Sequence, residues 1–145
     1  MKFTALLFLI GITQISFSQQ STLKQAVWRG ELHRLDSVIV PFTFETKKVA
    51  GKWSITLRNA AEKIVAKEIV VTADSVNFSM PVFESSFQTA IQKDGSLKGI
   101  WLKGTATKTQ QWVFTAFPAK PRFAASTIKP RHNLSGRWAV TFIRP

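Results

Sequence analysis

Large apolar residues alternate with polar ones along most of this chain, and this repeat of two limits the fold more than any other feature. Trp53, Ile55 and Leu57, for example, are separated by Ser54 and Thr56. Successive side chains of a β-strand point to opposite faces, whereas an amphipathic helix needs apolar residues three and four positions apart. The same alternation recurs at residues 28–33, 38–45, 75–80, 97–102, 112–116 and 136–143. The sequence therefore predicts an all-β fold.

Turn residues separate these segments at the spacing of short hairpins. Turns are expected at residues 49–51, 58–60, 73–75 and 93–96, and the Asp94-Gly95 pair is the strongest of these signals because glycine tolerates a positive φ. Residues 62–71 contain Glu and Lys, which allow a helical turn, but their Ile and Val content favours a strand. We therefore expect an antiparallel up-and-down barrel of the lipocalin or calycin kind, or a partly open barrel, with about eight to nine strands.

Aromatic residues lie on one face of nearly every predicted strand. In a closed sheet of about eight strands that face points inward, where side chains can fill the interior or leave room for one small ligand. We expect a packed core or the lining of an apolar pocket for a small hydrophobic ligand. Binding of nucleic acid is disfavoured, because the aromatic rings share their face with Val, Leu and Ile and not with the cations. The residues expected to line the interior are Trp28, Leu32, Phe42, Phe44, Trp53, Phe78, Trp101, Trp112 and Trp138.

The first residues have the pattern of a secretory signal peptide. Lys2 precedes the apolar run 3–12, and Ser16 and Ser18 supply small residues at the positions that signal peptidase reads. The run is shorter than the roughly 20 residues that span a bilayer. We expect residues 1–18 to be a signal peptide, and the chain to reach the periplasm or the extracellular space after cleavage near Ser18.

The remaining chain divides into four predicted parts. Residues 19–25 are expected to be a flexible segment, and residues 26–118 a β-barrel-like module. Residues 119–135 contain Pro, Lys and Arg and are expected to form a connection. Residues 136–145 are expected to form a final strand that leads into a further domain downstream.

The charge of the chain is unevenly distributed. The formal net charge is +12, from 20 Lys and Arg against 8 Asp and Glu, yet no acidic residue follows Gly95. Such an asymmetry marks a surface for a following domain or an acidic partner, or else a solvated cationic face without a partner. Export makes cellular nucleic acid an improbable partner, and a membrane surface is disfavoured as well.

The sequence lacks the residue patterns of common catalytic sites. It has no Cys, which excludes thiolate catalysis, disulfides and zinc ribbons. His33 and His132 are its only histidines, and the acidic residues occur singly, without the spacing of metal ligands. No glycine-rich phosphate loop is present. We expect a chain that is not an enzyme and that has no catalytic residue, cofactor or metal.

The order of four short motifs resembles a known kind of module. Residues 28–32 read Trp-Arg-Gly-Glu-Leu and residues 40–44 read Val-Pro-Phe-Thr-Phe. Residues 73–81 read Ala-Asp-Ser-Val-Asn-Phe-Ser-Met-Pro, and residues 95–101 read Gly-Ser-Leu-Lys-Gly-Ile-Trp. This order resembles the N-terminal all-β module of exported Bacteroidetes-type thioredoxin-family proteins of the TlpA/ResA disulfide-reductase type. A similar pattern precedes some exported α/β-hydrolases.

The resemblance implies a role without catalysis. The redox activity of that family resides in a Cys-x-x-Cys pair, and this chain offers no position for it. The resemblance therefore implies an exported accessory or binding module, part of a longer or truncated protein, with a thioredoxin-like domain downstream or a client protein as its partner. The alternatives are a free-standing lipocalin-like carrier of a small hydrophobic ligand and an accessory module of an exported hydrolase.

Overall fold

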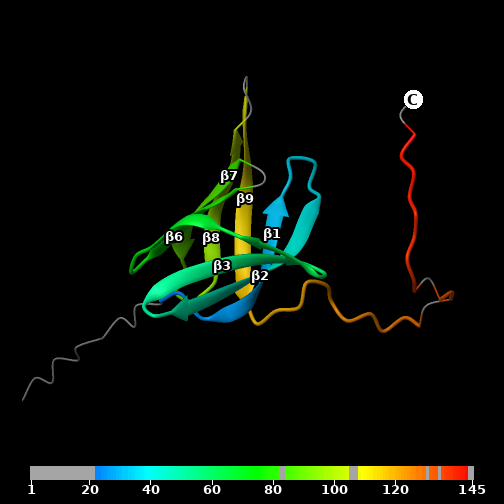
Figure 1. Cartoon of the computed structure of the whole chain (residues 1–145), viewed down its shortest axis with the longest axis horizontal. Coiled ribbons are helices and arrows are strands. Elements are labelled where there is room, and N and C mark those ends of the chain that lie inside the picture. Colours follow the sequence, from blue (N-terminus) through cyan, green and yellow to red (C-terminus); the bar gives the residue numbers. More distant parts are fainter. Residues whose placement is uncertain (1–21, 82–83, 105–107, 130, 134, 144–145) are drawn as a thin grey trace, which may run out of the picture.

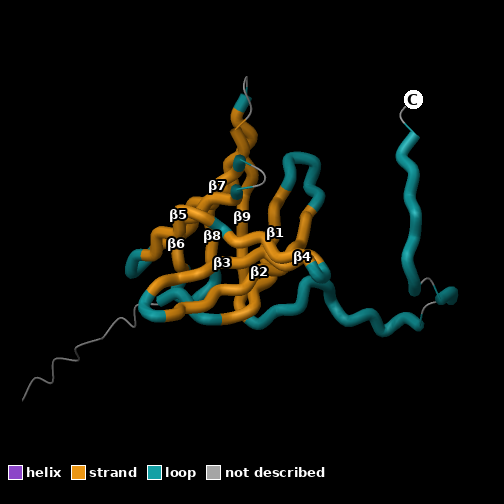
Figure 2. Tube along the Cα trace, viewed as in Figure 1, coloured by secondary structure: helices purple, strands orange, loops and turns teal. Residues whose placement is uncertain are grey.

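The described part of the chain is built from antiparallel β-strands. The computed structural model describes residues 22–81, 84–104, 108–129, 131–133 and 135–143. These residues contain no helix, so the all-β prediction is confirmed (Figures 1 and 2). The strands are β1 (Ala26–His33), β2 (Ile39–Val49), β3 (Lys52–Asn59), β4 (Glu62–Val65), β5 (Lys67–Val71), β6 (Ser75–Met80), β7 (Ser85–Ile91), β8 (Leu97–Gly104) and β9 (Thr109–Pro118).

The strands form a nearly closed barrel with one unsealed seam. Their order in the sheet is β4-β3-β2-β1-β9-β8-β7-β6-β5. Almost every pair of strands that are neighbours in the sheet is therefore also consecutive in the sequence. The exception is the pairing of β1 with β9, which brings Trp28 opposite Pro118 and His33 opposite Val113. The two ends of the sheet, β4 and β5, are consecutive in the chain, and the seam lies between them. The predicted barrel of eight to nine strands is confirmed.

The segment 62–71 forms both edges of the seam. It was predicted as one strand, and the structure divides it at Ala66, whose N–H donates to the Ile55 carbonyl at 2.8 Å. Before Ala66 the segment pairs with β3, and after it with β6. A bulge follows between Lys67 and Val70, with Glu68 at φ 50°. Short, charged and bulged edges of this kind discourage pairing with another chain.

The barrel interior is filled with aromatic rings. Trp28 stacks on Phe44 with ring centroids 5.7 Å apart, and Phe78 stacks on Phe87 at 4.6 Å. Phe114 meets Phe87 edge to face at 4.9 Å. The buried core consists of Leu23, Trp28, Phe44, Ile55, Ala66, Val76, Phe78, Met80, Phe87, Leu97, Trp101, Phe114 and Ala116.

Two inward-facing glycines make room for this core. Gly30 is paired with Phe42, and a Cβ on Gly30 would lie 2.6 Å from Cζ of the Phe42 ring. Gly99 allows a closer approach of backbones, since a Cβ there would lie 2.0 Å from the Gln88 carbonyl oxygen and 2.7 Å from the Thr89 Cα. Glycine inside a strand marks such close approaches.

A buried threonine attaches the N-terminal segment to the barrel. The Thr46 hydroxyl accepts a hydrogen bond from Trp28 Nε1 at 2.8 Å and donates one to the Lys24 carbonyl at 2.6 Å. Leu23 is buried in the core, and Gln25 Oε1 accepts from the Lys48 N–H at 2.9 Å. The prediction of a flexible segment at 19–25 is therefore wrong for residues 23–25, because the Leu23 side chain is buried in the core and Lys24 and Gln25 are hydrogen-bonded to β2. Residues 19–21 and the predicted signal peptide 1–18 lie outside the described residues.

Strand β7 carries almost no apolar alternation, and the sequence pattern did not indicate it. Phe87 is its one large core residue, while the other buried inward positions are Ser85 and Thr89. Thr89 satisfies its hydroxyl by donating to the Val76 carbonyl at 2.6 Å. Small hydroxyl residues can thus occupy inward positions when a backbone carbonyl of a neighbouring strand accepts a hydrogen bond from the hydroxyl.

The predicted final strand is wrong. Residues 136–143 have no strand pairing, and in Figure 1 they run as an extended segment apart from the barrel. Trp138 is 67% exposed and Phe142 is 89% exposed. The alternation is real, but a strand also needs a neighbouring backbone to bond with, and no described strand pairs with this segment. The chain leaves the barrel after β9, where the Ala119 N–H donates to the Val27 carbonyl at 2.8 Å.

The described residues contain no helical segment with the length and apolarity of a bilayer span.

We expect Gly99→Ala to lower the free energy of unfolding by about 3 kcal/mol, because its methyl group overlaps backbone atoms that cannot move aside. Gly104→Ala is the matched control, since a Cβ at Gly104 meets no atom within 4 Å. Urea denaturation of the two variants measures the difference. Equal stabilities would contradict the close approach of β7 and β8.

Candidate functional site

Most of the predicted interior residues gather inside the barrel. Four are buried, namely Trp28, Phe44, Phe78 and Trp101, and four are half-buried against them, namely Leu32, Phe42, Trp53 and Trp112. Trp138 does not join them, because it belongs to the extended C-terminal segment and is 67% exposed. The placement of Trp138 in the interior is therefore wrong, because the predicted strand that contains it does not pair with the barrel.

The rings inside the barrel contact one another instead of surrounding a space. Phe42 lies between three other rings, with centroid distances of 6.0 Å to Phe44, 6.2 Å to Phe87 and 6.0 Å to Phe114. Its ring also covers Gly30. A ligand at this level of the barrel would have to displace Phe42. Of the two uses expected for these residues, the observed contacts are those of a packed core.

A pair of tryptophans packs across β8 and β9. Trp101 and Trp112 are directly opposite in the register, and their ring centroids are 4.8 Å apart. The guanidinium carbon of Arg34 lies 5.7 Å from the centroid of the Trp112 ring. This cation–π contact covers the more exposed of the two rings.

A polar cluster lies on the outer face of β1 and β9. His33 Nε2 is 3.0 Å from Thr115 Oγ1 and 3.8 Å from Glu31 Oε2. Arg29 Nε is 2.7 Å from Glu31 Oε1, yet this buried N–H makes no hydrogen bond of acceptable geometry, so the contact is an ion pair alone. A nucleophile and its orienting carboxylate must use opposite nitrogens of the histidine. Here both groups approach Nε2, so the cluster does not have the geometry of a catalytic triad.

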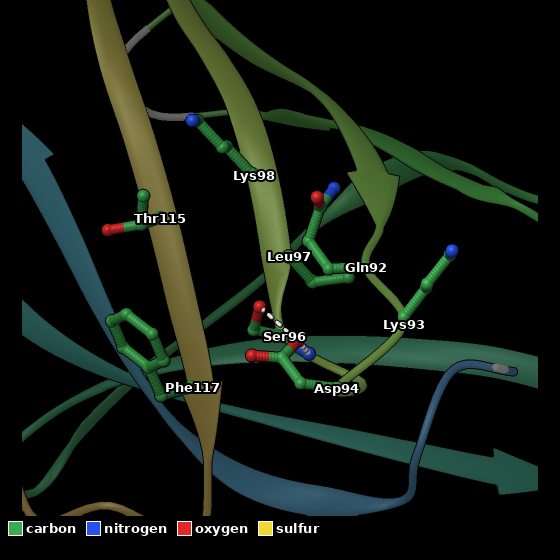
Figure 3. A pocket seen from close by; sticks show the side chains of 8 residues that line it. All are labelled: Gln92, Lys93, Asp94, Ser96, Leu97, Lys98, Thr115 and Phe117. Carbon is green, nitrogen blue, oxygen red and sulfur yellow. Dashed lines mark hydrogen bonds between the residues drawn. The ribbon is translucent and has the colours of Figure 1, made fainter.

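An open groove of about 600 Å³ lies on the outer side of β8 and β9, beside the turn that connects β7 to β8. Figure 3 shows Thr115 and Phe117 projecting from β9, Lys98 from β8, and the turn residues on the opposite side. Phe117 is an aromatic residue on the outward face of β9, out of phase with Trp112 and Phe114. The lining residues are Gln92, Lys93, Asp94, Ser96, Leu97, Lys98, Thr115 and Phe117.

The turn at one side of the groove is held by hydrogen bonds within the chain. Asp94 Oδ1 accepts from the Ser96 hydroxyl at 2.6 Å and from the Ser96 N–H at 2.9 Å. Gly95 has φ 80°, and its N–H donates to the Gln92 carbonyl at 2.8 Å. These bonds from Ser96 hold the pKa of Asp94 below its ordinary value, and the nearby Lys24 ammonium acts in the same direction.

Lysines surround this groove. Lys93 and Lys98 line it, and Lys120 Nζ lies 4.2 Å from the centroid of the Phe117 ring. Lys24 Nζ rests against Gly95, where an added Cβ would be only 2.7 Å away. The sequence indicates a basic C-terminal part of the chain but not this groove, because the lysines around the groove come from four separate segments.

Among the described residues, no three His, Asp or Glu side chains lie close enough together to hold a metal ion. The chain has no cysteine. Comparisons with protein-family models, with curated proteins and with solved structures find no match to this chain.

We expect Asp94→Asn to lower the melting temperature more at pH 7 than at pH 2. The folded pKa of Asp94 lies below its unfolded value of about 3.9, so the ionised carboxylate stabilises the fold at every pH above that value. This stabilisation is lost as the pH falls through the folded pKa. Thermal unfolding of both proteins at the two pH values measures it, and an equal loss of melting temperature at pH 7 and pH 2 would contradict the role of the charge.

Proposed function

We propose that this chain is an exported accessory module without catalytic activity, which binds a thioredoxin-like thiol-disulfide oxidoreductase domain or that domain's client protein. In this proposal the barrel is a rigid support and binding occurs on its outside. The resemblance carried by the four motifs at 28–32, 40–44, 73–81 and 95–101 suggests the kind of partner. The signal-peptide pattern at 1–18 suggests the compartment in which they meet.

The observation that carries this proposal is the extended segment 136–143. Val140, Phe142 and Ile143 are 69%, 89% and 89% exposed, although a sequence of this pattern is suited to one buried sheet face. Exposed apolar surface on a polar chain commonly marks an interaction site. An extended segment with alternating apolar side chains can add as a strand to the open edge of a partner sheet.

The packed interior further supports binding on the outside. Phe42 and the rings around it contact one another inside the barrel, where a lipocalin-like carrier would hold its ligand. The outer polar cluster of Arg29, Glu31, His33 and Thr115 has no nucleophile–base geometry. An accessory role therefore accounts for more of the described surface than the carrier role does.

Site-specific photocrosslinking in the cells that make the protein tests this proposal. We expect p-benzoylphenylalanine at Phe142 to crosslink to a protein that contains a thioredoxin fold with a Cys-x-x-Cys pair. The same group at Leu35, which is 92% exposed on the barrel, is the control and should not crosslink to that protein.

Mass spectrometry of the crosslinked products decides the outcome. A thioredoxin-fold protein recovered from position 142 and absent from position 35 supports the proposal. The same products from both positions, or products from position 142 without a thioredoxin-fold protein, contradict it.

A further inference from the structure

The groove on β8 and β9 has an excess of positive charge. Lys24, Lys93, Lys98 and Lys120 lie in or beside it, and Asp94 is the only acidic residue among its described lining residues. Four lysines and one aspartate give a local formal charge of +3. The Asp94 carboxylate accepts two hydrogen bonds from Ser96, and its charge, which these bonds do not cancel, is already included in that sum.

The groove also has an apolar part. Phe117 contributes hydrocarbon to its wall, whereas the Leu97 side chain is only 1% exposed and belongs to the core. Thr115 adds a hydroxyl opposite Lys98 in the strand register. Its volume of about 600 Å³ is in the range of ligand sites, roughly 300–1,000 Å³. Its open shape suits an extended chain that lies along the surface better than a small molecule that must be enclosed.

We propose that this groove binds an acidic peptide segment, with carboxylates at Lys98 and Lys120 and an apolar side chain against Phe117. The lysines supply point charges for carboxylates, and the ring supplies contact area that a purely electrostatic surface lacks. The biological setting rests on the proposed function, since the segment would belong to the partner or its client. The groove itself does not include residues 136–143, so its binding can be measured separately from that of the C-terminal segment.

Phosphates of a nucleic acid would meet the same lysines, and they are the competing ligand class. Base stacking requires an accessible aromatic face. Phe117 is the one aromatic residue among the described residues that line the groove, so the groove has no row of rings on which successive bases could stack. The charge and the apolar wall together therefore favour a peptide with alternating acidic and apolar residues.

Fluorescence anisotropy with the full exported chain tests the proposal. The probe is a fluorescein-labelled pentapeptide of sequence Glu-Leu-Glu-Ser-Glu, and its twin with Gln in place of each Glu carries the same label. We expect the acidic peptide to bind at least about 10-fold more tightly than the neutral twin at low salt, and the difference to shrink as salt is raised.

Charge-reversal variants locate the binding. Lys98→Glu should weaken binding of the acidic peptide by about 10-fold, because a like charge then faces the carboxylate that Lys98 would bind. Lys63→Glu is the matched control, since it makes the same change of charge on the exposed edge strand β4, and it should leave the affinity within about twofold. Phe117→Ala should weaken binding without changing its salt dependence.

Three results would overturn the proposal. The first is equal affinity for the acidic peptide and its neutral twin. The second is equal weakening by Lys98→Glu and Lys63→Glu, which would show attraction to the overall charge of the protein. The third is tighter binding of a single-stranded oligothymidylate than of the acidic peptide, with the same dependence on Lys98. None of these results depends on crosslinking at Phe142, so failure of this proposal and failure of the proposed function are distinguishable.

Discussion

The packing of Phe42 across Gly30 is the contact on which the barrel most depends. The two residues face each other on β1 and β2, and the missing side chain of the glycine is the space that the ring occupies. From there Phe42 reaches Phe44, Phe87 and Phe114, which belong to three different strands. Such ring pairs each contribute about 0.5–1.5 kcal/mol beyond the area that they bury. One ring thus connects strands on several sides of a nearly closed sheet.

Because the interior of the barrel is filled by side chains, we expect partners to bind on its outer surface. Two groups of charged residues on that surface differ in their arrangement. On β1, Glu31 is paired with Arg29 and lies near His33, so this cluster largely neutralises itself. Around Phe117 on β9 the lysines outnumber the acids, and the neighbouring chain continues into a segment rich in Lys and Arg. A partner with acidic residues would be attracted to this second region.

The sequence was most informative where a local signal was strong. Alternation at Trp53, Ile55 and Leu57 predicted a strand, and the Asp94-Gly95 pair predicted the turn at residues 93–96. Both signals depend on neighbouring residues alone. Strand β7 escaped prediction because Thr89 is buried through a hydrogen bond to another strand. Trp138 was misplaced because an alternating pattern indicates which side chains a strand could bury, but it does not indicate whether a neighbouring strand is present to pair with it. The groove escaped for a related reason, since its lysines meet only after the barrel has formed.

The central claim is that the barrel is filled by its own side chains and binds its partners on the outside. Titration of the intrinsic tryptophan fluorescence with N-phenyl-1-naphthylamine tests it most directly, because Trp28 is fully buried beside Phe44 and the dye carries no charge that the lysines would attract. We predict no saturable quenching of the tryptophans and no saturable rise in dye fluorescence. Saturable quenching at a ratio of one dye per chain would show an interior ligand site and contradict the account.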